Sequence, residues 1–185
     1  GTVPNGGNGY SALVDDQGGP AQGKLQLSVY NDYGNNGAHG AGQWVEALVF
    51  QERQLAAGDA GQWHFEFDGK RGNLASPTTA YAFIKTLNPA ANWATTNFVQ
   101  VDMTAIPDTW NRYSLSFAVD SSLSGQVLQF GFANKATRYA GSGVFYDNIN
   151  FATAPVPEPS TYALMFAGLG LVGAVARRRA ARTRR

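Results

Sequence analysis

Three side chains that could carry proton-transfer or metal chemistry, His64, Glu66 and Asp68, alternate along one short segment. Alternate residues of an extended strand face the same side and stand about 6.6 Å apart. That spacing suits a divalent metal, and for Glu66 and Asp68 it suits the two carboxylates of a glycosidase, which lie roughly 5 to 9.5 Å apart. Any strand with one solvated face shows the same polar alternation. We favour this simpler interpretation and assign no catalytic residue.

Asp147 is a candidate metal ligand, because it shares its strand parity with Phe145, Ile149 and Phe151, which we expect to face the core. A bare carboxylate on a buried face is costly. A structural calcium ion, bound through oxygen atoms, is one solution, and Asp16 would add an oxygen if the N-terminal segment passes nearby. A hydrogen-bonded aspartate at a strand bulge is the alternative.

Aromatic residues in loop-like surroundings are candidate ligand-binding residues, because sugars stack on flat rings. Trp93 lies in such a segment, and Tyr30 and Tyr33 lie at a predicted strand end. Trp63 and Trp110 fall within strand patterns, and we expect them in the core.

Nucleophilic catalysis finds little support in the sequence. The chain has no cysteine and two histidines, and it contains no G-x-S-x-G segment. We therefore predict that it is not an enzyme.

Short strands must position these residues. Apolar and polar side chains alternate along several segments, which indicates half-buried strands. We predict strands over residues 24–29, 44–51, 63–67, 80–87, 97–103, 113–119, 128–132 and 144–151, with turns at residues 36–37, 58–61, 68–69 and 124–125. This pattern predicts an all-β fold, an antiparallel two-sheet β-sandwich of the jelly-roll type.

The composition indicates one folded domain with little affinity for nucleic acid. The chain has 185 residues, of which 44% are hydrophobic and 15% charged. Its formal charge is +1, but six of the 14 basic residues lie within the last nine positions. Residues 1–155 hold 8 basic and 12 acidic side chains, a net charge of −4. That balance argues against binding to DNA or RNA.

The C-terminal segment reads as a membrane signal. Prolines punctuate a linker over residues 153–159, and the next seventeen residues, 160–176, carry no charge. As a helix this run would reach roughly 25 Å, the lower end of the range for a transmembrane span. The arginine-rich tail 177–185 would stay cytoplasmic, which leaves the rest of the chain outside. The alternative is a core helix followed by a basic tail.

The order Pro157-Glu158-Pro159, apolar run and Arg177-Arg178-Arg179 resembles the PEP-CTERM sorting domain. The resemblance implies a Gram-negative bacterium that makes exopolysaccharide, with an exosortase acting on the tail at the inner membrane. In that family, the Pro-Glu-Pro positions form the recognition element. Because the chain begins without an initiator methionine or a signal peptide, we expect either that an export signal has been removed or that the sequence is a fragment.

We predict that residues 1–152 form the exported domain. From Gln54 onward, this domain resembles carbohydrate-binding modules of the galactose-binding-like kind. The resemblance rests on the turn Leu55-Ala56-Ala57-Gly58, on Trp110-x-x-Tyr113 and on the closing segment 145–151. Such modules bind glycans on a sheet face or at loop tips, and many hold structural calcium near the last strand.

Together these features predict a non-catalytic protein of the cell surface or extracellular matrix that associates with exopolysaccharide. The alternatives are a structural adhesion module without a ligand and, third, a glycan-active enzyme that uses Glu66 and Asp68.

Overall fold

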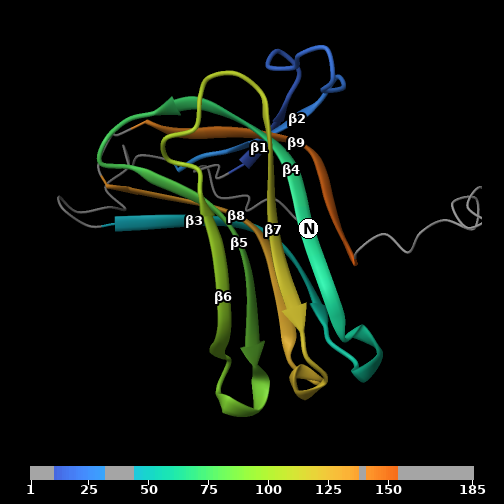
Figure 1. Cartoon of the computed structure of the whole chain (residues 1–185). Coiled ribbons are helices and arrows are strands. Elements are labelled where there is room, and N and C mark those ends of the chain that lie inside the picture. Colours follow the sequence, from blue (N-terminus) through green and yellow to red (C-terminus); the bar gives the residue numbers. More distant parts are fainter. Residues whose placement is uncertain (1–10, 32–43, 138–140, 154–185) are drawn as a thin grey trace, which may run out of the picture. The chain divides into compact units, whose positions relative to one another are not determined.

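The computed structural model describes residues 11–31, 44–137 and 141–153, which form an all-β domain of two antiparallel sheets (Figure 1). The strands are β1 (Ser11–Val14), β2 (Gln26–Val29), β3 (Trp44–Gln54), β4 (Gly61–Leu74), β5 (Thr79–Asn88), β6 (Ala94–Asp102), β7 (Asn111–Val119), β8 (Val127–Thr137) and β9 (Ser142–Thr153). The five-stranded sheet has the order β1-β2-β9-β4-β7, and the four-stranded sheet has the order β3-β8-β5-β6. This strand order agrees with a jelly-roll connectivity that carries one further edge strand, β1.

The eight predicted strands are confirmed, and most extend beyond their predicted ends. The four-residue strand β1 was not predicted, because it is too short to show an alternating pattern. The turn predicted at Asp68-Gly69 is wrong, since both residues lie inside the 14-residue strand β4. A Cβ atom on Gly69 would come 2.8 Å from the Met103 side chain, so this glycine permits close packing rather than a turn.

The core lies between the two sheets and is rich in aromatic rings. Phe65 and Phe67 on β4 face inward with Phe132 on β8 and Tyr146 on β9, and all four are almost fully buried. The rings of Phe132 and Tyr146 stack with centroids 3.6 Å apart, and the Phe67 ring meets Phe132 edge-on at 5.0 Å. These contacts join strands of opposite sheets, and Phe65, Phe67 and Phe132 belong to the alternating apolar positions that the sequence predicted.

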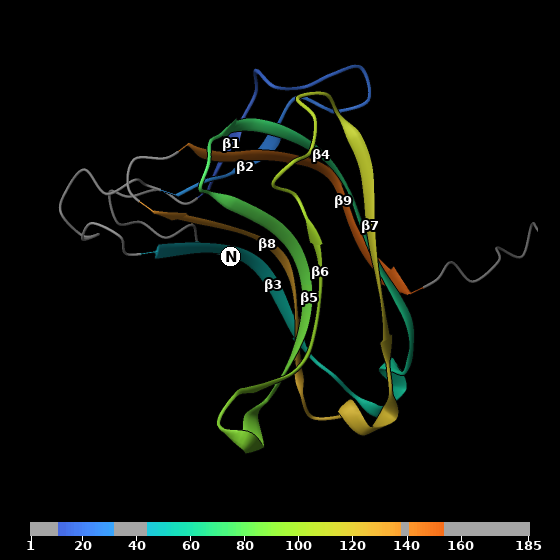
Figure 2. The same ribbon diagram turned by 60° about the vertical axis from the view of Figure 1, so that its left-hand side comes forward.

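Both sheets bend along their length (Figure 2). Strands β4 and β9 pass along the outside of the bend, and β3, β8 and β5 pass along its inside. The face of the four-stranded sheet that points away from the core is therefore concave. Strands β6 and β7 lie side by side and close one edge of the sandwich.

Short 3-10 helices cap the connections at one end of the sandwich. Asp59 closes η1 (Ala57–Asp59) by accepting a hydrogen bond from the Ala56 N–H at 2.8 Å, and Asp120 begins η3 (Ser121–Leu123) by accepting one from the Ser122 N–H at 2.8 Å. Such side-chain acceptors satisfy backbone donors that a short helix leaves open.

The chain divides into two units, Gly1–Thr153 and Ala154–Arg185. Among the residues that the structure describes, no helix is long and apolar enough to cross a membrane. The predicted transmembrane segment 160–176, the arginine tail 177–185 and the turn at residues 36–37 lie outside those residues.

Candidate functional site

A cluster of aromatic rings occupies the concave outer face of the four-stranded sheet. Tyr81 and Phe83 lie on β5, Phe98 lies on β6 and Phe50 lies on β3. The Phe98 ring is 6.0 Å from Tyr81 and 6.3 Å from Phe83, measured between centroids. Phe98 and Phe50 remain 48% and 42% exposed. Large apolar side chains gathered on a solvent-facing sheet indicate a recognition surface rather than a core. We call these four residues the aromatic face.

Gly131 separates Phe83 from Phe50 in the register of this sheet, because it pairs with both across β5, β8 and β3. A Cβ atom at this position would lie 2.1 Å from the Val49 carbonyl oxygen and 2.6 Å from the Phe50 Cα. The backbones of β3 and β8 therefore approach too closely for any side chain. Only glycine leaves the space between the two phenylalanines open.

Polar side chains with fixed orientations border the aromatic face. The Tyr81 hydroxyl donates a hydrogen bond to Glu46 Oε1, and burial together with this carboxylate raises the pKa of Tyr81, which therefore stays protonated. The Lys85 ammonium lies 5.2 Å from the Phe83 ring centroid and helps to cover that ring, which is fully buried. Rings flanked by donors and acceptors combine stacking with hydrogen bonding.

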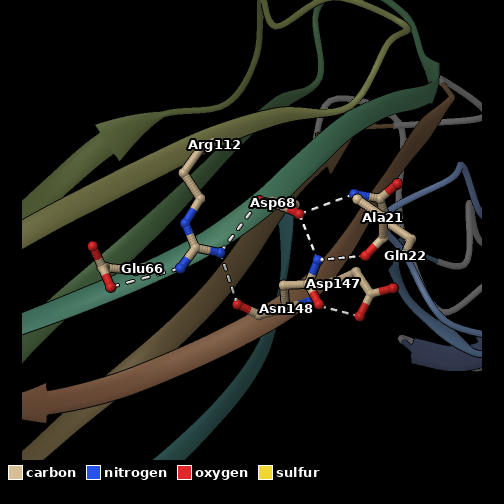
Figure 3. Close-up of polar contacts among 7 residues, drawn as sticks. All are labelled: Ala21, Gln22, Glu66, Asp68, Arg112, Asp147 and Asn148. Carbon is tan, nitrogen blue, oxygen red and sulfur yellow. Dashed lines mark hydrogen bonds and ion pairs between the residues drawn. The ribbon is translucent and has the colours of Figure 1, made fainter.

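A polar cluster occupies the outer face of the five-stranded sheet, where β4, β7 and β9 lie side by side (Figure 3). Asp68 is its centre. Its Oδ2 accepts hydrogen bonds from Gln22 Nε2 at 2.9 Å and Asn148 Nδ2 at 2.7 Å, and its Oδ1 is 3.2 Å from Arg112 Nη1. Arg112 also donates to the Asn148 carbonyl at 3.0 Å. These contacts fix the β1–β2 connection and the β9 bulge against β4.

Glu66 and Asp68 lie on one outer face, as the alternation predicted, but both face Arg112. Glu66 Oε2 is 3.6 Å from Arg112 Nη2. Partial burial acts to raise the pKa of Asp68, but hydrogen bonds from Asn148, Gln22 and Arg112 outweigh it and hold that pKa below its ordinary value. A glycosidase needs one carboxylic acid with a raised pKa to protonate the leaving group. Asp68 is unsuited to that role.

Asp147 lies on the outer face of the sheet rather than in the core, so the predicted parity is wrong. Its partner across the sheet is Asp68, which points outward, whereas Val144 and Tyr146 are fully buried. The reason is a bulge: Asn148 adopts a positive φ of 48° and adds one residue opposite β4, which reverses the alternation along β9. Phe145, expected in the core, lies on the outer face as well.

The environment of Asp147 partly fits a calcium ion. Its Oδ1 accepts a hydrogen bond from the Asn148 N–H at 2.6 Å, while its Oδ2 is buried and has no hydrogen-bond partner. An orphaned carboxylate oxygen is a natural cation ligand. Asp16 is exposed, and in the described ranges no three His, Cys, Asp or Glu side chains gather as a metal site. His64 belongs to no such group in the described ranges, and its Nδ1 lies 3.0 Å from the Ser116 hydroxyl.

The predicted ligand-binding aromatics do not join the aromatic face. Trp93 is 57% exposed at the tip of the β5–β6 hairpin, five residues before Phe98. Tyr30 is half-buried and directly follows β2, a strand of the five-stranded sheet. Tyr33 lies outside the described residues. Trp63 is in the core as expected, but Trp110 is only half-buried and precedes β7.

The aromatic face was missed because it lies within predicted strands. One signal could have revealed it: β5 is apolar at both parities, with Ala80, Ala82 and Ile84 facing inward and Tyr81 and Phe83 facing outward. Apolar residues at both parities indicate that both faces of a strand are covered or functional.

The remaining predicted residues, Pro157 to Pro159 and Arg177 to Arg179, lie outside the described residues, and a comparison with protein families bears on them. A family model described as a PEP-CTERM protein-sorting motif matches residues 155–179. The predicted sorting signal is thereby confirmed, and it implies an exported, membrane-sorted protein. No curated protein matches the chain.

Solved structures similar to this chain include carbohydrate-binding β-sandwiches, as the sequence resemblance predicted. The active domain of bacteriophage CBA120 tailspike protein 4 is 12% identical with a TM-score of 0.50, and the match covers 78% of this chain but 18% of the tailspike chain. TmCBM61 in complex with β-1,4-galactotriose is 12% identical with a TM-score of 0.45, covering 78% and 83%. The second family 16 carbohydrate-binding module is 13% identical with a TM-score of 0.47, covering 77% and 85%. At these identities the likeness concerns the fold alone.

Proposed function

We propose that this protein is a non-catalytic component of the cell surface or extracellular matrix that binds polysaccharide through the aromatic face. The observation that carries the proposal is the exposure of Phe50 and Phe98 on a concave sheet, with the open position Gly131 next to Phe50. A concave sheet accommodates an extended polymer along its length. Ring faces stack against the C–H faces of sugars, and the neighbouring polar groups give hydrogen bonds to hydroxyls.

The sorting motif supports the cellular part of the proposal. An exosortase would act on the tail at the inner membrane, with residues 160–176 spanning it, residues 177–185 inside and the β-sandwich outside. After sorting, the β-sandwich would reach the surface or the matrix, where polysaccharide is the expected partner.

Calcium at Asp147 is part of the same proposal and has a structural role. Asp147 Oδ2 would hold the ion, which would tie the β9 bulge to its surroundings. Asp16 stays a predicted second ligand. The ion would supply no chemistry to glycan binding, because Asp147 lies on the other sheet from the aromatic face.

Affinity electrophoresis of the full chain in gels that contain soluble neutral polysaccharides tests the function. We expect retardation by at least one polysaccharide, and we expect Phe98→Ala and Phe50→Ala each to weaken it about tenfold, which is the loss of one stacked ring at roughly 1.4 kcal/mol. Leu13→Ala is the matched control, since it removes an exposed apolar side chain from the other sheet.

Three outcomes would replace the proposal. Binding that Trp93→Ala abolishes and Phe98→Ala leaves intact would move the site to the hairpin tip. Absence of binding to every polysaccharide would favour a structural adhesion module. Hydrolysis that Glu66→Gln abolishes would instead revive the enzyme.

A further inference from the structure

A pocket lies on the outer side of the five-stranded sheet, away from the aromatic face. Its volume is about 700 Å³. The β1–β2 connection forms one wall with Gln17, residues 108–112 at the start of β7 form the other, and Lys70 on β4 contributes the floor. Nothing in the proposed function uses this pocket.

Lys70 is the basic group with free hydrogen-bonding capacity in the pocket. Its ammonium donates one hydrogen bond to Gln17 Oε1 at 3.1 Å and lies about equally far from two aromatic rings, 6.0 Å from Trp110 and 5.9 Å from Phe145. Within the described residues Lys70 makes no ion pair. The rings and Gln17 hold the ammonium in place, and its other N–H groups can meet a ligand.

The wall beside the ammonium is held by internal contacts. Trp110 Nε1 donates to the Gln17 carbonyl oxygen at 2.9 Å, which fixes the indole against the β1–β2 connection. The connection approaches the ring so closely that a Cβ atom on Gly19 would lie 3.2 Å from Trp110 Cδ1. Gln22, only 8% exposed, is fixed in turn by its hydrogen bond to Asp68. The pocket is therefore formed before any ligand arrives.

The charges of the pocket favour a ligand with one negative group. Asp68 is neutralised by Arg112 at 3.2 Å, and its oxygens are already engaged. That leaves Lys70 on the floor and Asp108 exposed at the rim. A carboxylate on the floor would gain a charge-assisted hydrogen bond from Lys70, while the exposed Asp108 at the rim would oppose it only weakly.

We propose that this pocket binds an acidic sugar of the uronic-acid class, with its carboxylate at the Lys70 ammonium and its ring against Trp110. The site is separate from the aromatic face and would recognise a different glycan. A protein with both sites would connect an acidic chain on one sheet to a neutral chain on the other, which is a cross-linking role in a matrix.

Calorimetric titration of the full chain with trigalacturonic acid, beside a neutral trisaccharide of the same size, tests the proposal. We expect the acidic trisaccharide to bind and the neutral one to bind at least tenfold more weakly. Lys70→Gln should weaken the acidic ligand roughly tenfold, since a hydrogen bond to a charged group contributes about that much, and Lys70→Arg should restore most of the affinity. Lys24→Gln is the matched control, because it removes the same charge from the β1–β2 connection without lining the pocket.

Asp108→Asn gives a second, opposite test. Removing the rim carboxylate should tighten uronate binding by about twofold to threefold. Weaker binding in Asp108→Asn would overturn the proposal, as would equal affinities for Lys70→Gln and the unaltered chain or no uronate binding at all. Loss of uronate binding in Phe98→Ala but not in Lys70→Gln would assign the uronate to the aromatic face. Neutral-polysaccharide binding is measured separately, so each proposal can fail alone.

Discussion

The outer faces of the two sheets have opposite characters. On the five-stranded sheet, Asp68, Arg112 and Asn148 satisfy one another, and their contacts join β4, β7, β9 and the β1–β2 connection. On the four-stranded sheet, Phe50 and Phe98 expose apolar rings that no other side chain covers fully. Mutually satisfied polar groups stabilise a fold, whereas exposed rings indicate a surface that awaits a partner.

Gly131→Ala should have the largest effect, because the new methyl group would meet the backbone of β3. We expect the free energy of unfolding to fall by about 3 kcal/mol and polysaccharide binding to fall with it. Chemical denaturation measures the stability. Gly58→Ala, at a position with no atom within 4 Å of the new Cβ, should change it by under about 0.5 kcal/mol. A loss in Gly131→Ala as small as that in Gly58→Ala would show that β3 and β8 can move apart to accept the methyl group.

Asp68→Asn should have the second-largest effect, because it removes the charge that three donors share while the amide keeps a similar shape. Asp68 is only 13% exposed, and we expect a loss of about 1.5 kcal/mol in the free energy of unfolding. Asp15→Asn, at an exposed position, is the control. Unchanged polysaccharide binding in Asp68→Asn would sharpen the division between a stabilising face and a recognising face, and lost binding would break it.

The pH dependence of stability tests the same carboxylate without mutation. Because the pKa of Asp68 is lower in the folded chain than in the unfolded chain, its contribution is complete above the unfolded pKa and is lost as pH falls through the folded one. Between about pH 5 and pH 3, the melting temperature of the unaltered chain should fall faster than that of Asp68→Asn. Parallel curves for the two proteins would remove Asp68 from the explanation.

Calcium should have the smallest effect on stability. Its binding would show that the outer face of the five-stranded sheet also holds a ligand, which modifies the contrast between the two faces. We expect millimolar calcium to raise the melting temperature by about 3 °C, and we expect Asp147→Asn to abolish the rise. Magnesium, which demands a smaller and more regular oxygen shell, is the control ion. A melting temperature that neither calcium nor a chelator changes would remove the ion from Asp147.

The sequence could predict elements whose signal is local. Trp63, Phe65 and Phe67 face the core as their alternation predicted, and the sorting signal was recognised from a contiguous run of residues. Asp147 and Phe145 were placed on the wrong face, because the parity of a strand cannot be extended across a bulge that the sequence does not show.

What the sequence determined by itself is therefore the strands, the alternating faces within each uninterrupted strand and the sorting motif at residues 155–179. The tertiary structure alone decided which rings meet. Phe83 and Phe98 come from two strands and meet through the register of β5 and β6, while the register of β3, β8 and β5 places Phe50 on the same face. Register depends on pairing between distant segments and on one close backbone approach at Gly131. Neither produces a periodic pattern in the sequence.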